Sequence, residues 1–253
     1  MEWINQIIRY CYDQGWGGEI YDVVVIIAFA TQFAFLLIYR EKYGIPLGKA
    51  CLSFLLIYSV GYFLILVLAW MENGFQHWGS RSIIRVYIYL PLICAAVSKV
   101  VKIPAKMLCD FIAPGVSLAA GMMLQACPFA GCSHGYACEW GIWNPVKNTR
   151  LFPNQWLESI VALGIVVFLV NQAKKEHYIG KGRIYAIFLT AFGSTRFLLE
   201  FLRNNEKLVL GLSTFSFHAL FMAIVGTVWL FVLAEKEREE KRKAEHKQQK
   251  RKK

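Results

Sequence analysis

Three charged side chains, Arg196, Glu200 and Arg203, stand at helical spacing near the end of a long apolar run. Residues three and four apart lie on one face of an α-helix, so these groups are expected to be neighbours. Paired arginines suit phosphate binding, because the planar guanidinium fork matches phosphate oxygens bidentately. A plainer interpretation stays open, in which Arg196 and Glu200 form an intrahelical ion pair and Arg203 extends toward lipid headgroups.

The helix that must carry these residues is predicted to cross a membrane. The run begins near Gly182 and is otherwise Ile, Leu, Phe, Ala and Tyr, close to the ~20 residues that a spanning helix needs. At ~1.5 Å per residue, Arg196 lies about 10 Å from Arg203, which we place at the water boundary. An unpaired arginine at that depth costs on the order of 2.5 kcal/mol or more, so Glu200 is its expected partner.

The composition predicts an all-α integral membrane protein. Hydrophobic residues make up 57% of the 253 residues, charged residues 18%, and the mean hydropathy is +0.41. We expect one polytopic membrane domain over residues 1–234, without a cleavable signal peptide. About seven transmembrane helices are predicted from seven apolar runs, at 20–39, 51–71, 82–98, 105–126, 156–171, 183–202 and 213–234.

Lysine and arginine concentrate in the connectors after the first, third and fifth runs. By the positive-inside rule this places the N-terminus outside and the C-terminus in the cytoplasm. Residues 1–19 carry aromatic side chains at amphipathic spacing, which predicts either a helix in the outer interface or a simple aromatic belt. Residues 235–253 predict a basic cytoplasmic tail that is attracted to anionic lipid. Nucleic acid is not an expected partner, because a basic tail after a last span is ordinary topology.

The outer connector between the fourth and fifth runs has an unusual composition. Its cysteines, histidine and central glycines are Cys127, Gly131, Cys132, His134, Gly135 and Cys138. Zinc binding, a disulfide, and a Cys132–His134 nucleophilic pair are all open interpretations. We favour a Gly-rich re-entrant loop in which Gly131 and Gly135 let backbone amides approach a ligand. On that interpretation no metal and no cofactor are expected.

Three further charged residues lie near the ends of apolar runs. Arg85 places a second positive charge at outer-leaflet depth, or reaches back to the surface. Asp110, early in the fourth run, is near enough to the N-terminus of its own helix to be expected to cap amides or meet the dipole there. Glu158 follows a predicted N-cap, Asn154, and either assists capping or places a carboxylate at the mouth of a cavity.

Four segments, in this order, resemble the bacterial prolipoprotein diacylglyceryl transferases: 110–114, 131–135, 153–158 and 196–203. The resemblance covers the chain from about Ser82 to the last span. It implies seven spans in a bacterial plasma membrane, with the N-terminus out and the C-terminus in. It also implies an enzyme that moves diacylglyceryl from phosphatidylglycerol to the thiol of a lipobox cysteine in a prolipoprotein.

The resemblance assigns roles to individual residues. Arg196, Glu200 and Arg203 are similar to the family's phosphate-binding helix, Glu158 to its carboxylate after Pro-x-Gln, and Asp110 to its early-span aspartate. The family's loop arginine and glutamate would fall at Leu124 and Cys132, and its third-span histidine is absent. Arg85 is the candidate to replace the positive charge and His134 the candidate to replace the base.

Two functions are therefore carried forward. In the first, the chain is a transferase whose catalytic residues are Arg196, Glu200, His134 and Glu158. Its substrate-binding residues are then Arg203, Arg85, Gly131, Gly135 and Asp110. In the second, the chain keeps the lipid pocket but has lost transfer, and acts as a lipid-binding or partner-binding scaffold.

Overall fold

The computed structural model describes residues 2–72, 74–75, 84–132, 134–175, 178–205 and 211–251. Helices dominate the described chain, and a short antiparallel sheet lies between two of them. The elements in chain order are α1 (Glu2–Asp13), α2 (Gly17–Tyr39), the 3-10 helix η1 (Arg40–Tyr43), α3 (Leu47–Glu72), α4 (Ile84–Val101), α5 (Ala105–Met123), α6 (Cys127–Ala130), β1 (Ala137–Asn144), β2 (Thr149–Leu151), α7 (Asn154–Ala173), α8 (Arg183–Glu200) and α9 (Thr214–Arg251).

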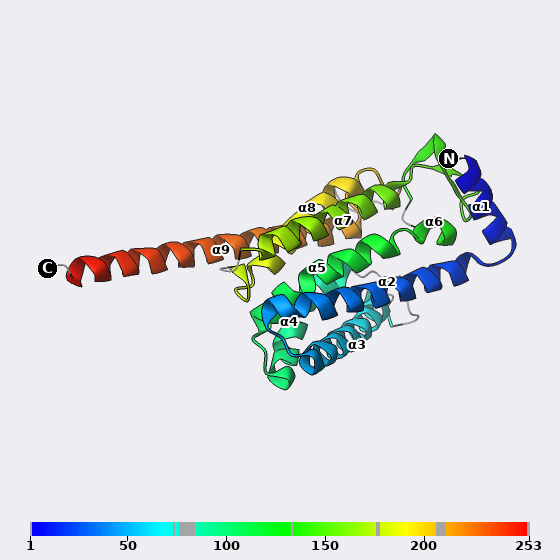
Figure 1. The fold of residues 1–253 in the computed structure, drawn as a ribbon. Coiled ribbons are helices and arrows are strands. Elements are labelled where there is room, and N and C mark those ends of the chain that lie inside the picture. Colours follow the sequence, from blue (N-terminus) through cyan, green and yellow to red (C-terminus); the bar gives the residue numbers. More distant parts are fainter. Residues whose placement is uncertain are drawn as a thin grey trace.

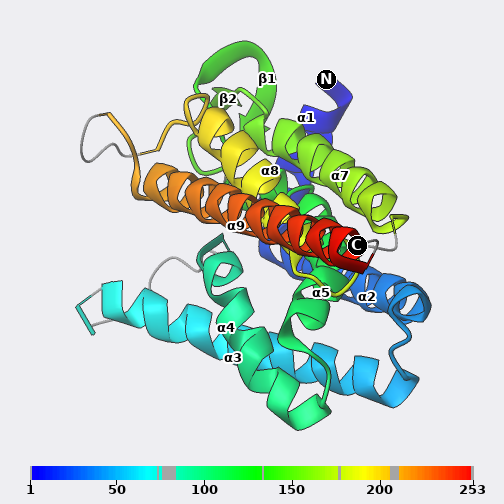
Figure 2. The same ribbon diagram turned by 90° about the vertical axis from the view of Figure 1, so that its left-hand side faces the viewer.

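The long helices pack lengthwise, with α5 at the centre of the bundle. It contacts α2, α4, α7 and α8, while α8 packs along α9. Figure 1 shows α1, α6 and the strands at one end of the bundle, and the C-terminal part of α9 extending beyond the other end. In Figure 2, α3 and α4 lie on the side of the bundle away from α7 and α8.

Each of the seven predicted apolar runs coincides with a long helix of this bundle. Among the described residues, five helical stretches are long and apolar enough to cross a membrane, and Val86–Val101 is a shorter apolar helix. These five are Gly17–Tyr43, Leu47–Met71, Ala105–Met123, Asn154–Ala173 and Thr214–His246. The chain is thus a multi-pass helical membrane protein, as its composition predicts.

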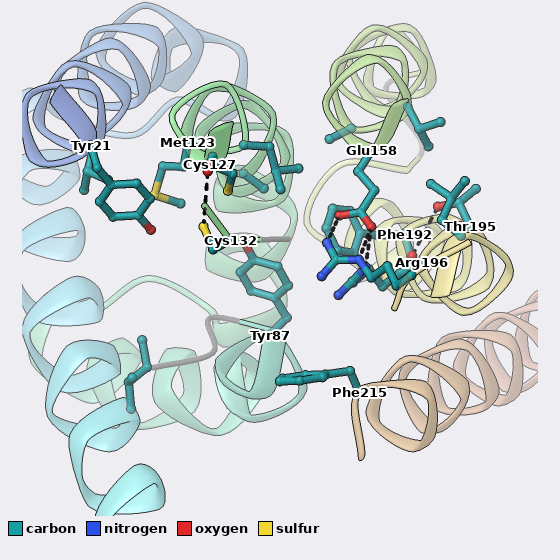
Figure 3. A pocket seen from close by; sticks show the side chains of 18 of the residues that line it. Tyr21, Tyr87, Met123, Cys127, Cys132, Glu158, Phe192, Thr195, Arg196 and Phe215 are labelled. Carbon is teal, nitrogen blue, oxygen red and sulfur yellow. Dashed lines mark hydrogen bonds and ion pairs between the residues drawn. The ribbon is translucent and has the colours of Figure 1, made fainter. Parts of the chain in front are cut away.

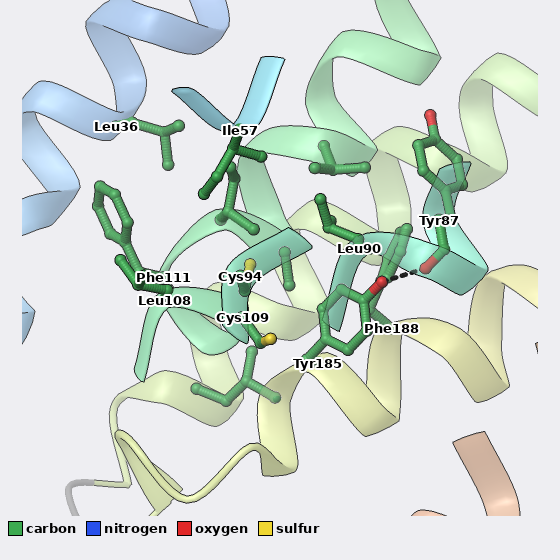
Figure 4. Close-up of a cluster of buried hydrophobic side chains, with 14 of the residues drawn as sticks. Leu36, Ile57, Tyr87, Leu90, Cys94, Leu108, Cys109, Phe111, Tyr185 and Phe188 are labelled. Atoms are coloured by element: carbon green, nitrogen blue, oxygen red, sulfur yellow. Dashed lines mark hydrogen bonds between the residues drawn. The ribbon is translucent and has the colours of Figure 1, made fainter. Parts of the chain in front are cut away.

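The core of the bundle forms where α8 packs against α4 and α5. Tyr185, Phe188 and Leu189 of α8 are fully buried, because apolar residues at this spacing share one helix face. Figure 4 shows Tyr185 reaching α4, where its hydroxyl donates to the carbonyl oxygen of Tyr87. This contact fixes the rotation of α8, and therefore the direction in which its charged residues point.

The connector after α5 is ordered differently from the predicted irregular re-entrant loop. It forms the one-turn helix α6 and a hairpin in which β1 pairs with β2 around a bulge between Ala137 and Ile142. The N-terminal helix α1 packs on this hairpin, since Asn5 Oδ1 accepts from Trp143 N at 2.8 Å. The amphipathic pattern of residues 1–19 therefore buries one face of α1 against protein, while Trp3 and Tyr10 stay exposed.

Asp110 caps a helix of another segment. Its Oδ2 accepts from the backbone N–H of Gly182 at 2.8 Å, and its Oδ1 accepts from Tyr185 N at 3.0 Å. The carboxylate is fully buried and meets the positive end of the α8 dipole. Arg196 lies fourteen residues after Gly182, which is about 21 Å along the axis of α8. The sequence predicts that Asp110 contacts the N-terminus of its own helix, whereas the structure places its carboxylate on the first amides of α8.

We expect Asp110→Ala to destabilise the fold by about 2–3 kcal/mol, because two hydrogen bonds to a buried carboxylate are lost. The measurement is the free energy of unfolding in detergent, together with lipid binding by the folded fraction. Lipid affinity should be unchanged. Normal stability combined with lost lipid binding would instead support the substrate-binding role that the family resemblance implies for Asp110.

Candidate active site

A cluster of charged side chains joins α7 to the end of α8. Glu158 accepts one hydrogen bond from Arg196, through Nη1. It accepts two from Arg203, through Nε at 2.6 Å and through Nη2. Figure 3 shows Glu158 pointing from α7 toward Arg196 of α8. Glu158 is 38 residues from Arg196 and 45 from Arg203 in the sequence, so only tertiary packing brings them together.

Glu200 is the second carboxylate of the cluster. Its Oε2 lies 3.2 Å from Arg196 Nη2 and 3.7 Å from Arg203 Nε. Its Oε1 accepts from Ser213 Oγ at 2.7 Å and from the side-chain amide of Asn205. The predicted pairing of Arg196 with Glu200 is confirmed, and both arginines bridge the two carboxylates.

The cluster is buried and electrically balanced. The side chains of Glu158, Glu200 and Arg203 are less than a tenth exposed, and that of Arg196 is 12% exposed. Two positive and two negative groups face one another, and both carboxylates also accept hydrogen bonds from neutral side chains. Such mutual compensation is required, because an unpaired buried charge is strongly destabilising.

Asn154 supports Glu158 from one turn earlier in α7. Its Nδ2 donates to Glu158 Oε1 at 2.7 Å. The sequence predicts Asn154 as the N-cap, but Pro153 holds that position and the amide of Asn154 points into the cluster instead. Of the two interpretations left open for Glu158, the structure favours the cavity carboxylate over capping.

The cluster forms one wall of a cavity of 470 Å³. Glu158, Arg196 and Arg203 supply the charge, and most of the remaining lining is apolar. In Figure 3 the wall opposite Glu158 carries Tyr21, Cys127 and Cys132. A site of this kind fits a ligand with an anionic group and an apolar body.

A second cavity of 410 Å³ adjoins the first between α2, α3, α4 and α5. The two share Phe29, Tyr62, Ile65 and Tyr87 in their linings. The lining of the second cavity is almost wholly apolar. Together the two cavities form a charged end followed by a long apolar space.

Comparison of the sequence with known proteins identifies its family. The sequence model of prolipoprotein diacylglyceryl transferase matches residues 28–232, most of the chain. The chain belongs to the prolipoprotein diacylglyceryl transferase family. The matched range contains all four charged residues of the cluster, so the resemblance drawn from four short segments is confirmed.

Individual relatives are phosphatidylglycerol–prolipoprotein diacylglyceryl transferases. The chain is 33% identical over 129 residues to transferase 2 of Clostridium perfringens, covering 47% of this chain and 49% of the relative. It is 31% identical over 166 residues to the Clostridium tetani protein, covering 62% and 63%. It is also 31% identical over 132 residues to the Methylobacillus flagellatus protein, covering 49% and 50%. The matches thus span between about half and just under two thirds of each relative.

His134, the predicted replacement base of this family member, lies beside the cluster. Its ring is half-buried, with Nδ1 3.4 Å from the carbonyl oxygen of Gly135. Burial lowers the pKa of His134 below its usual value, and nearby Lys147 and Arg203 act in the same direction. The uncharged form of the imidazole is therefore favoured. It is not among the residues that line the 470 Å³ cavity.

Gly131 and Gly135 contact protein rather than the cavity. Gly131 has φ +66° and ends α6, and an added Cβ would lie 2.6 Å from the side chain of Val146. Gly135 forms a bridge with Arg203 and donates its N–H to the carbonyl oxygen of Phe152 at 3.0 Å. The sequence predicts both glycines at a ligand. Neither glycine is among the residues that line the 470 Å³ cavity, and Gly135 pairs with the backbone of Arg203.

Two of the connector cysteines face the cavity. The N–H of Cys132 donates to the carbonyl oxygen of Cys127 at 3.1 Å, and the N–H of Gly131 donates to the carbonyl oxygen of Pro128 at 3.4 Å. These two bonds form a helix C-cap that keeps Cys132 close to Cys127. Cys138 lies in β1. In the part of the chain that the structure describes, no three His, Cys, Asp or Glu side chains gather to hold a metal ion. The geometry therefore gives no support to the zinc interpretation.

The other predicted site residues are not placed in the cluster. Asp110 lies at the opposite end of α8, and the side chain of Arg85 lies outside the described residues, although its backbone belongs to α4. Sequence reasoning missed the support that Asn154, Asn205 and Ser213 give to the carboxylates. Only Asn154 carried a signal, since it stands four residues before Glu158 on one helix.

Proposed function

We propose that this protein transfers the diacylglyceryl group of phosphatidylglycerol to the thiol of a lipobox cysteine in a prolipoprotein. The observation that carries the proposal is the convergence of Arg196 and Arg203 at the charged end of an otherwise apolar cavity. Two guanidinium forks suit a phosphate, and the apolar walls suit acyl chains. The names of the relatives support phosphatidylglycerol as the donor and a prolipoprotein as the acceptor.

In this reaction the acceptor sulfur attacks the carbon of the diacylglycerol unit that bears the phosphate. The carbon–oxygen bond breaks as the sulfur–carbon bond forms, and glycerol phosphate leaves. Negative charge grows on the phosphate during this step, so guanidinium groups fixed in a buried site stabilise the transition state. Arg196 and Arg203 are proposed to have that role, and before the lipid binds Glu158 and Glu200 hold them in place.

We further propose seven transmembrane helices, α2, α3, α4, α5, α7, α8 and α9, in a bacterial plasma membrane. The N-terminus would lie outside and the C-terminus in the cytoplasm, as the distribution of basic connectors favours. The cavity, near the end of the bundle that carries α1 and the strands, would then open toward the outer leaflet. The basic end of α9 would face anionic cytoplasmic lipid.

The test is transfer itself, with the full chain purified in detergent. Phosphatidylglycerol labelled in its head-group glycerol and a synthetic lipobox peptide are supplied together. We expect labelled glycerol phosphate to be released in step with a mass increase of the peptide by one diacylglyceryl group. A peptide whose lipobox cysteine is replaced by serine is the matched control and should give neither product.

A lipid-binding scaffold is the second candidate. The observation that favours it is Cys132, a cavity-lining residue at the position where the resemblance places the family's loop glutamate. Saturable binding of phosphatidylglycerol without release of glycerol phosphate, over hours and with peptide in excess, would favour the scaffold over the transferase.

A further inference from the structure

The hydrogen-bond donors that would recognise a phosphate are engaged by a carboxylate of the protein itself. Glu158 receives Nη1 of Arg196 and both Nε and Nη2 of Arg203. A phosphate bound bidentately by these arginines would use the same N–H groups. Glu158 and a lipid phosphate therefore compete for one set of donors.

Charge balance points the same way. Two guanidinium groups and two carboxylates give the cluster a formal charge of zero, and all four side chains are largely buried. A phosphodiester adds one negative charge to a place where an uncompensated charge is costly. One carboxylate must therefore withdraw or become neutral as the phosphate enters.

The two carboxylates differ in their neutral partners and in their access to the cavity. Oε1 of Glu200 accepts from Ser213 and Asn205, and Glu200 is not among the residues lining the 470 Å³ cavity. Glu158 lines that cavity, and besides the two arginines Asn154 donates to its carboxylate. Of the two carboxylates, Glu158 is therefore the one whose side chain can rotate into the cavity.

We propose that Glu158 is an internal counter-anion that the lipid phosphate displaces, and that it then accepts the proton of the acceptor thiol. This inference rests on the proposed function. The S–H proton passes to Glu158, the sulfur bonds to the glycerol carbon, and the electron pair of the broken C–O bond stays on the phosphate. The phosphate gains one negative charge just as Glu158 loses one, so the total charge of the site is unchanged.

The decisive variant is Glu158→Gln, which removes the charge and keeps the size. In chloride the full-length variant should unfold at a lower temperature than wild type, because two buried guanidinium groups are left with one carboxylate. Inorganic phosphate at matched ionic strength should then raise its melting temperature by about 5 °C, and should leave wild type almost unchanged. Glycerol phosphate should act similarly.

Lipid arms separate a free phosphate site from a lipid site. Micelles containing phosphatidylglycerol should stabilise Glu158→Gln, and micelles containing diacylglycerol, which has the same chains without phosphate, should not. Stabilisation by inorganic phosphate alone would overturn the lipid part of the proposal. Glu200→Gln is the matched control, since it removes the same charge from the carboxylate that does not line the cavity, and it should respond to phosphate much less.

Catalysis provides the second readout. Glu158→Gln should keep lipid binding and lose at least about 100-fold in transfer rate, the lower end of the range for removal of a general base. Full transfer activity in this variant, or a phosphate response no larger than that of Glu200→Gln, would overturn the proposal. If wild type transfers diacylglyceryl but phosphate does not stabilise Glu158→Gln, the displacement is refuted and the proposed function stands. If phosphate stabilises Glu158→Gln but wild type shows no transfer, the proposed function and the proton transfer are refuted and the displacement stands.

If Glu158→Gln does not fold, a second variant tests the same competition. Glu158→Asp keeps the charge on a side chain one methylene shorter, which weakens its contact with both guanidinium groups. It should bind phosphatidylglycerol severalfold more tightly than wild type. Weaker or equal binding would contradict competition between this carboxylate and the phosphate.

Discussion

Lysine in place of Arg196 is expected to reduce the rate of diacylglyceryl transfer at least about 100-fold, the usual effect of losing one fixed donor to a growing negative charge. Arg196 uses Nη1 on Glu158 and Nη2 on Glu200, which lie on different helices. A single ammonium nitrogen cannot reproduce that planar fork. The measurement is glycerol phosphate release from labelled phosphatidylglycerol with a lipobox peptide present.

The same helix provides the matched control. Arg183, in the first turn of α8, pairs with Glu237 at 3.0 Å and lies 4.3 Å from the ring centre of Tyr178, far from the cavity. Arg183→Lys makes the same chemical change at the other end of α8 and should alter transfer less than about twofold. Arg196→Lys with intact lipidation would remove the phosphate role from Arg196.

The sequence predicts the helical part of the site well, because that part depends on local geometry. Spacing on one helix places Arg196 beside Glu200 without any tertiary information. Apolar runs likewise predict where the long helices lie, since a run of ~20 apolar residues has few other uses. These predictions follow from periodicity alone.

The partner that completes the site could not be predicted in the same way. Glu158 reaches Arg196 and Arg203 only because α7 packs against α8, and the sequence equally allowed a helix cap.

The two strands were not predicted from the sequence, for a different reason. Residues of β1 are exposed in its first half and buried in its second, so the alternation that signals a strand is absent.

The position of Arg203 depends on the connector rather than on α8. The helix ends at Glu200, and Arg203 lies three residues beyond, where it bridges to Gly135 of the connector. Of the two arginines proposed to bind the phosphate, Arg196 is thus positioned by α8, and Arg203 by the segment that carries Cys132 and His134. A change in that segment should reach the cavity through Arg203.

Gly135→Val is accordingly expected to lower transfer at least tenfold while the membrane helices stay folded. A Cβ at Gly135 would lie 2.7 Å from the carbonyl oxygen of Leu202 and 2.9 Å from Cβ of Phe152. These atoms belong to the segments on either side of the bridge, so the added side chain moves Arg203 away from Glu158. Far-ultraviolet circular dichroism and the transfer assay measure the two effects. Cys132→Ala, a nearby change that only removes a thiol, should stay within about twofold. Near-normal transfer in Gly135→Val would show that Arg203 does not depend on this bridge.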